Sequence, residues 1–266
     1  MIYTTSQLRE QHTPRQITAL VAARRLHRAG RYYVTPDTST DVRKALAAGL
    51  RPTCLTAAKE HELWVPPGRG VHAYGRRVDP GWGTHGWHQA WPEEHPVASP
   101  ALLLQHAALC LDPLHAGVLA DSALRMGKVT QAEVAAVARS APRPAARVLG
   151  RATGVSESGT ESKVRLFLQL HNVMVTPQVQ IEGVGRVDLL VGRRWILECD
   201  SRAHHTGEVT YEYDRARDLA AVQRGYFSMR LTHAMIFGGW AETAESLLRV
   251  VRTGAHLDLP EEWACR

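Results

Sequence analysis

Hydrophobic and polar residues change their spacing near residue 158, and the new pattern predicts alternating helices and strands. Apolar positions recur at helical spacing in some segments and at every second residue in others. A small sheet flanked by helices follows from this order of elements. The expected elements are a helix over 160–172, strands over 178–182, 186–191 and 195–200, a helix over 210–224, a strand over 226–231 and a helix over 240–252.

The first 45 residues predict two short helices followed by a basic hairpin. Thr5 is expected to begin a helix that runs through Leu8. Thr13-Pro14 begins a second helix, because a capping hydroxyl is followed by proline at the first helical position. Residues 26–34 predict two short strands around a glycine turn. This is the outline of a winged helix-turn-helix, which places its second helix in the DNA major groove and its wing on phosphates.

Residues 46–142 predict a mixed region that is first β-rich and then helical. Short apolar stretches at 54–56, 63–65 and 71–74 alternate with turn signals. Ser99-Pro100 begins a helix that is apolar nearly all round, and Thr130 with Glu133 forms a capping box.

Proline, glycine and serine then mark a boundary near 140–157. The predicted fold class is therefore α/β (α+β). The expected division is a winged helix-turn-helix at 1–45, a mixed region at 46–142, a linker at 143–157, a mixed sheet flanked by helices at 158–255 and a tail at 256–266.

Composition narrows the class of protein. The chain has 266 residues, of which 44% are hydrophobic and 22% charged, which excludes a wholly disordered, collagen-like or coiled-coil chain. No apolar run is long enough to span a membrane, and no signal-peptide core follows the N-terminus. We therefore expect a cytoplasmic protein without a membrane partner.

The cysteines and histidines do not follow a known metal-binding spacing. The four cysteines lie far apart, with no CxxC motif, which argues against a disulfide framework and a structural zinc site. The histidines of residues 52–98 also match no ligand pattern, and no metal site is expected there. These residues are Cys54, Cys110, Cys199 and Cys265, and His61, His72, His85, His88 and His95.

Positive charge is concentrated at the N-terminus. Residues 1–51 hold nine basic and three acidic residues, a surplus of six that equals the net charge of +6 for the whole chain. A basic module on a neutral body indicates a nucleic-acid partner. The alternative is a packing module that binds only protein. The residues expected to dock DNA are Arg15, Arg24, Arg25, Arg28 and Arg31.

Acidic residues lie inside the predicted strands of the C-terminal part. Strand interiors disfavour aspartate, and an unpaired buried carboxylate is costly. Asp188, Glu198 and Asp200 lie on neighbouring strands of the meander, so their oxygens are expected to converge. Glu161, on the preceding helix, can approach the same point. Converging carboxylates suit Mg²⁺ or Mn²⁺. Asp200 lies at the end of its predicted strand, where turns favour aspartate, so an ordinary structural role also explains an acid at this position.

These residues follow the pattern of a known nuclease family. The motifs are Glu161-x3-Arg165, Gln178, Arg186-Val187-Asp188, Glu198-Cys199-Asp200, His205, Asp214-x2-Arg217, Gly225-Tyr226 and Arg230. In this order, over about 158–252, they resemble endonuclease-like domains related to very-short-patch-repair (Vsr-type) nucleases of the PD-(D/E)XK superfamily. Residues 1–140 resemble the antitoxin-type winged-helix region of abortive-infection systems, on Leu8, Gly30-Arg31-Tyr32-Tyr33-Val34 and Asp121-x2-Leu124-Arg125-x-Gly127.

The resemblance implies a metal-dependent DNA endonuclease of repair or phage defence. Asp188 and Glu198 would hold Mg²⁺, and the metal would lower the pKa of an attacking water. His205 would act as a general base or donate to the leaving oxygen. Arg217 and Arg230 would face the scissile phosphate, while Gln178 and Arg186 would position the DNA backbone.

One position departs from the family pattern. Asp200 stands where the superfamily usually has lysine, so it is either a further metal ligand or a sign of lost catalysis. Two alternatives therefore stay open: a non-catalytic DNA-binding regulator with a degenerate nuclease fold, and one half of a toxin–antitoxin pair. The oligomeric state, a homodimer included, is open as well.

Overall fold

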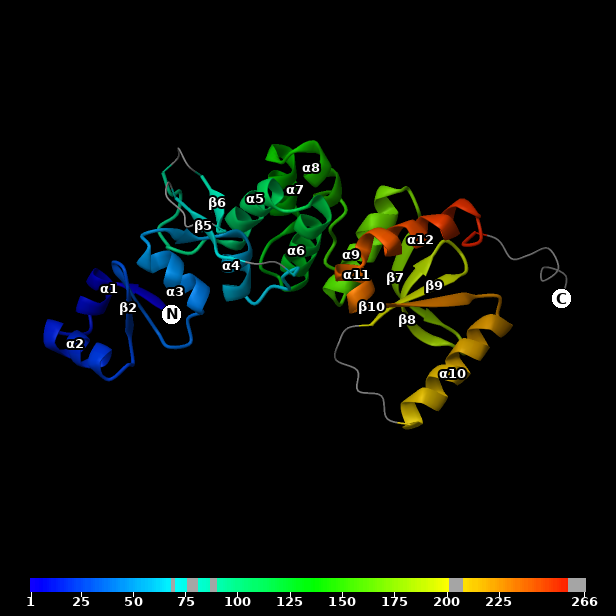
Figure 1. Ribbon diagram of the computed structural model, residues 1–266, viewed down its shortest axis with the longest axis horizontal. Helices are drawn as coiled ribbons and strands as arrows, with labels where there is room; N and C mark the ends of the chain where they lie inside the picture. The colour runs from blue at the N-terminus through cyan, green and yellow to red at the C-terminus, as the bar shows by residue number, and fades with distance from the viewer. Residues whose placement is uncertain (68–69, 76–80, 87–89, 201–207, 258–266) are drawn as a thin grey trace.

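The computed structural model describes residues 1–67, 70–75, 81–86, 90–200 and 208–257. Helices and strands are mixed, and the described strands form three sheets, which confirms the predicted α+β class at that level. An N-terminal unit, a helical middle region and a C-terminal α/β unit follow one another along the molecule (Figure 1). No described helix is both long enough and apolar enough to cross a membrane.

The N-terminal unit has the predicted two helices and hairpin. Its elements are β1 (Ile2–Thr4), α1 (Thr5–Arg9), α2 (Pro14–Ala22), β2 (His27–Ala29), β3 (Tyr32–Val34) and α3 (Thr40–Ala47), with strand order β1-β3-β2. Thr13 caps α2 in a capping box with Gln16, whereas α1 is capped by Thr4 and not by Thr5. Ile17 packs with Leu8 and Leu26, so the apolar face of α2 forms the core of the unit.

The region after it contains less strand than the sequence predicts. Its elements are β4 (Arg51–Pro52), α4 (Cys54–Glu60), β5 (His72–Tyr74) and β6 (Gly83–His85). The predicted strand at 54–56 is wrong, because these residues begin helix α4, and 63–65 form neither helix nor strand. All five residues from Cys54 to Ala58 are buried. A short apolar run cannot by itself distinguish a buried strand from a buried helix.

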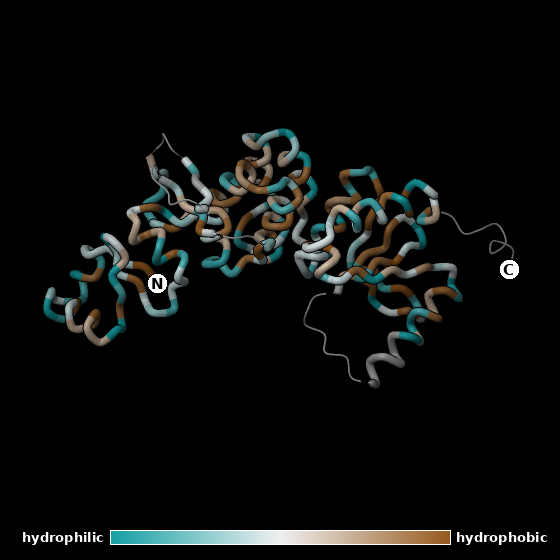
Figure 2. The backbone as a smooth tube through the Cα atoms, viewed as in Figure 1, coloured by the Kyte–Doolittle hydropathy of each residue, from teal (hydrophilic) through white to brown (hydrophobic). Residues whose placement is uncertain are grey.

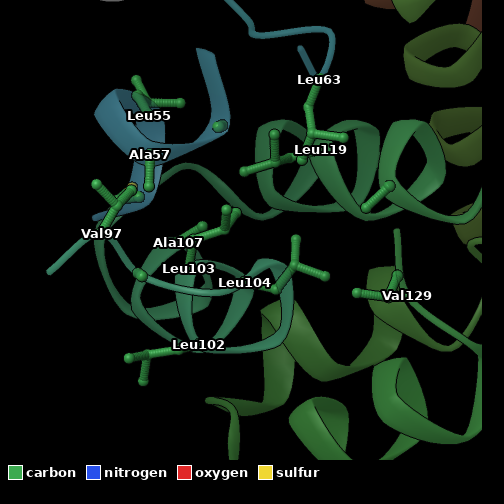
Figure 3. Packing of buried hydrophobic residues seen from close by; sticks show 14 of the residues in the cluster. Leu55, Ala57, Leu63, Val97, Leu102, Leu103, Leu104, Ala107, Leu119 and Val129 are labelled. Atoms are coloured by element: carbon green, nitrogen blue, oxygen red, sulfur yellow. The ribbon is translucent and has the colours of Figure 1, made fainter. Parts of the chain in front are cut away.

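Four helices form the middle region: α5 (Pro100–Cys110), α6 (Pro113–Arg125), α7 (Gln131–Ser140) and α8 (Arg143–Leu149). The predicted caps are confirmed, since Ser99 caps α5 and Thr130 forms a capping box with Glu133. Leu102, Leu103 and Leu104 of α5 are all buried, and Figure 3 shows Leu103 and Leu104 on the side of α5 toward Leu119 of α6. Hydrophobic segments gather inside this region (Figure 2). Most of the helix therefore lies in the core, as its nearly continuous apolar surface predicts.

Residues 143–157 form a packed connection where the sequence predicts a linker. Helix α8 begins at Arg143, and its Val148 packs against Val118 of α6 and Leu166 of α9 (Gly159–Leu170). A buried ion pair crosses the same boundary, with the Arg165 guanidinium 2.8 Å from an Asp121 carboxylate oxygen and both side chains 1% exposed. The middle region and the C-terminal unit therefore share a continuous interface.

The C-terminal unit is built on a four-stranded mixed sheet. After α9 come β7 (Val175–Ile181), β8 (Gly185–Val191), β9 (Trp195–Asp200), α10 (Glu208–Gln223), β10 (Phe227–Thr232), α11 (His233–Phe237) and α12 (Trp240–Arg252). The strand order is β10-β9-β8-β7, with β10 parallel to β9 and the other pairs antiparallel. Apolar residues of α9, α11 and α12 pack on one face of the sheet, and those of α10 on the other. Helix α11 is the one described element of this unit that the sequence did not predict.

Candidate functional site

Asp188 and Glu198 meet where the pairing of β8 with β9 ends. The last ladder pair is Leu189 with Leu197, and the next positions in that register are Asp188 and Glu198. There, side chains replace the backbone ladder: Cys199 N–H donates to Asp188 Oδ2 at 2.8 Å, and Asp188 N–H donates to Glu198 Oε2 at 3.2 Å. The predicted convergence of these two carboxylates is therefore present in the structure.

Glu161 and Gln178 extend the site toward helix α9. Glu161 is 4% exposed and accepts hydrogen bonds from Ser158 Oγ, the Glu157 N–H and Gln178 Nε2, the last at 2.7 Å. Gln178 has a positive φ of 54° within β7, at the position opposite Asp188. Such backbone geometry is costly for a residue with a side chain and concentrates at functional sites. The structure thus brings Glu161 and Gln178 to the carboxylate pair, as the sequence predicts.

The groups around the carboxylates of the site do not supply enough positive charge to offset the negative charge of these carboxylates. Burial, and after it the charge of Asp188, raise the pKa of Glu198 to about 7, against the opposing effects of the Asp188 N–H and Arg217. Burial also raises the pKa of Glu161; the Glu157 N–H and Ser158 lower it in part, and Asp188 raises it again. A group whose acid pKa is raised in this way gains from a proton or from a bound cation.

Of the three arginines predicted near the active site, one contacts the Asp188–Glu198 pair and two lie beside it. Arg217 of α10 lies 3.2 Å from Glu198 Oε1, and its Nη2 also donates to the Arg186 carbonyl at 2.7 Å. Arg186 itself pairs with Glu157. Arg230 lies beside Glu198 in the β9–β10 pairing, and its guanidinium is 3.2 Å from Asp218. Arg217 therefore completes the site directly, whereas the other two guanidinium groups contact acids next to it.

Two predicted catalytic residues are not tested by the structure. His205 lies outside the described residues, and so does the side chain of Asp200. The described part of the site therefore contains Asp188, Glu198, Glu161, Gln178 and Arg217.

The five arginines expected to dock DNA are all exposed on the N-terminal unit. Arg28 Nε donates to the Gly30 carbonyl in the hairpin, and Arg31 lies over the Tyr32 ring at 5.2 Å. Gly30 has a φ of 60°, and a Cβ there would lie 2.5 Å from the Leu46 carbonyl oxygen of α3. The hairpin therefore turns tightly against α3 and leaves its arginine side chains at the surface.

A second cluster of ligand-type side chains was missed by the sequence analysis. Cys54, His72, His85 and Cys110 each offer one ligand atom, and these atoms all lie within 4.8 Å of one another. Within the described ranges, no other set of three or more histidine, cysteine, aspartate or glutamate side chains meets this condition. No metal site was expected from these residues because they are widely separated in sequence. The fold brings them together in space.

Comparisons with protein-family models, with curated proteins and with solved structures found no match for this chain.

Proposed function

We propose that this chain is a divalent-metal-dependent DNA endonuclease with an N-terminal DNA-docking unit. The observation that carries the proposal is the half-buried pair of Asp188 and Glu198 at the end of the β8–β9 ladder, with the pKa of Glu198 raised to about 7. In this proposal, the C-terminal unit has a restriction-endonuclease-like fold of the PD-(D/E)XK type. Residues 1–45 form a winged helix-turn-helix.

The donor set of the pair fits a hard cation. Asp188 and Glu198 offer carboxylate oxygens, which Mg²⁺ and Mn²⁺ prefer. Asp188 also lies near enough to Glu161 for its charge to raise the pKa of Glu161. A bound Mg²⁺ would polarise the phosphate and lower the pKa of an attacking water. Gln178 holds Glu161 in place through its amide. Arg217, which contacts Glu198, would donate to a phosphate oxygen with its planar guanidinium.

Cleavage of DNA by the purified full-length chain tests this proposal. Supercoiled, linear, mismatched and branched DNA would be incubated with wild type and with Asp188→Asn, in Mg²⁺ or Mn²⁺ and in chelator. We expect metal-dependent nicking or cutting of at least one substrate by wild type and none by the variant. Identical behaviour of the two proteins on every substrate would contradict the proposal and favour the non-catalytic regulator.

Loss of the exposed arginines should weaken DNA binding in a salt-dependent way. For Arg15→Gln combined with Arg25→Gln, we expect about tenfold lower affinity for duplex DNA and a slope of log affinity against log salt smaller by about two, because each lost phosphate contact removes about one released counterion. Fluorescence anisotropy over a salt series measures both quantities. Arg249→Gln, an exposed arginine of α12, is the control and should leave both values unchanged. An unchanged salt slope in the double variant would show that these arginines do not meet phosphate.

A further inference from the structure

Four ends of elements converge on the Cys/His cluster. Cys54 is the first residue of α4, His72 the first of β5, His85 the last of β6 and Cys110 the last of α5. Their ligand atoms lie within 4.8 Å of one another, and Cys110 Sγ is 3.6 Å from His72 Nδ1. In a tetrahedral zinc site the ligand atoms are separated by about 3.3–3.8 Å, given the usual Zn–S and Zn–N bond lengths. The four side chains are thus already near the geometry that zinc requires.

Three of the four residues are buried and Cys110 is exposed, and the cluster is not saturated by protein partners. Cys54 is fully buried, and His72 and His85 are 7% and 5% exposed. The His85 Nε2 atom is buried and has no hydrogen-bond partner among the described residues, which is costly for an imidazole nitrogen. Cys54 also has a positive φ of 47°, a strained backbone conformation for a residue with a side chain. An ion bound at His85 Nε2 would give this nitrogen the partner that it lacks.

Polar contacts already join two of these side chains, since Cys110 Sγ lies 3.6 Å from His72 Nδ1. Zinc binds the thiolate form of cysteine and the neutral form of histidine.

Neighbouring residues hold both imidazole rings in place. The His85 ring stacks on that of His106 at 5.2 Å, and His106 Nδ1 lies 2.6 Å from Thr53 Oγ1, next to Cys54. Gly83 leaves room for the other ring, because a Cβ at this position would lie 2.6 Å from His72 Nδ1. Metal-binding histidines are commonly oriented in this way by an outer layer of contacts.

We propose that Cys54, His72, His85 and Cys110 bind a Zn²⁺ ion in a structural Cys₂His₂ site. Two sulfur and two nitrogen donors select zinc over the hard cations that suit the carboxylates of the C-terminal unit. Four protein ligands fill a tetrahedral shell, so no position is left for a substrate or a reactive water.

The ion ties together a region with little regular structure of its own. Strands β5 and β6 have three residues each and pair over that length, and the ion connects them to α4 and α5. The free energy of binding zinc is then free energy of folding for this region.

Metal analysis of the full-length protein tests the site. Mass spectrometry of the elements in protein purified without added metal is expected to find about one zinc per chain, and Co²⁺ substitution is expected to give the visible spectrum of tetrahedral thiolate coordination. Cys54→Ser with Cys110→Ser should lose the zinc and the cobalt spectrum. His12→Ala, a histidine beside α1 and α2, is the control and should keep both. Removal of zinc from wild type by a chelator should lower the Tm.

Three results would overturn the proposed site. None of them requires the double cysteine variant to fold as well as wild type does. Wild type that contains no zinc and takes up none after reduction would exclude it. A Cys54–Cys110 disulfide, seen as two missing hydrogens in the intact mass, would replace it. Zinc retained at equal stoichiometry in the double cysteine variant would place the ion elsewhere. Zinc content unchanged in Asp188→Asn separates this site from the carboxylate pair, so that failure of the nuclease proposal leaves this one standing.

Discussion

Glu198→Gln is expected to abolish metal-dependent DNA cleavage and, at the same time, to stabilise the metal-free protein above neutral pH. Cleavage should fall by about 100-fold or more, because the amide removes a charged ligand oxygen from the cation. Stability should rise because burial and Asp188 raise the pKa of Glu198 to about 7, so that its ionised form is unfavourable in the folded state.

The direction of the stability effect depends on pH. A carboxyl whose pKa is higher in the folded state contributes stability at low pH, and this contribution is lost as the pH rises from about 4.5 through about 7. The variant cannot ionise, so its advantage over wild type should grow across that window. We expect an advantage of about 1–2 kcal/mol at pH 8, since a pKa difference of one is worth about 1.4 kcal/mol and partial solvent exposure reduces the effect.

Chemical denaturation at pH 5 and pH 8, in chelator, measures the stability effect, and the cleavage assay measures the loss of function. Glu182→Gln, an exposed acid in the turn after β7, is the matched control and should change neither quantity. Added Mn²⁺ should stabilise wild type more than Glu198→Gln. If the variant cleaves DNA as well as wild type does, Glu198 is not a metal ligand.

Asp121→Ala is expected to lower the free energy of unfolding by about 3–5 kcal/mol, because it leaves the Arg165 guanidinium buried without a counter-charge. Asp121 is 1% exposed, and its carboxylate accepts hydrogen bonds from Arg165, from Ser162 Oγ and from the N–H groups of Thr153 and Gly154. Burial alone would raise the pKa of Asp121, but Arg165 and these donors hold it below its usual value. Its contribution is therefore fully present at neutral pH and is lost only in acid.

Thermal and urea denaturation at pH 7 measure the loss. Glu94→Ala removes an exposed acid from the segment before α5 and should change the stability by less than about 0.5 kcal/mol. A change in Asp121→Ala as small as that of Glu94→Ala would show that the buried network does not stabilise the fold.

Elements with a clear local signal were predictable from the sequence. The range of β9 is as expected, because a tight turn at 192–194 joins two alternating strands, and the start of α2 follows from Thr13-Pro14. The juxtaposition of Asp188 and Glu198 was also predictable, since the tight turn that pairs Val191 with Trp195 fixes the register of β8 against β9. Helix α4 was not, because its buried apolar run has no periodicity that separates helix from strand.

Contacts between distant parts of the chain could not be predicted in the same way. The zinc ligands are separated by at least a dozen residues and come from four different elements, so no local spacing rule detects them. The pairing of Asp121 with Arg165 is equally non-local, and the strained backbone at Gln178 depends on the neighbours of β7. The sequence signal for the Cys/His cluster is modest. It consists of cysteine and histidine residues in a region rich in turns.

The interface between α6, α8 and α9 determines where this chain can be divided. A fragment beginning at residue 158 would keep Arg165 but lose Asp121, and it would expose Leu166, whose partners Val118 and Val148 lie in the removed part. The sheet that carries the carboxylate pair is therefore not an autonomous cassette. Recombination that exchanges this unit between proteins would have to carry α6 along with it.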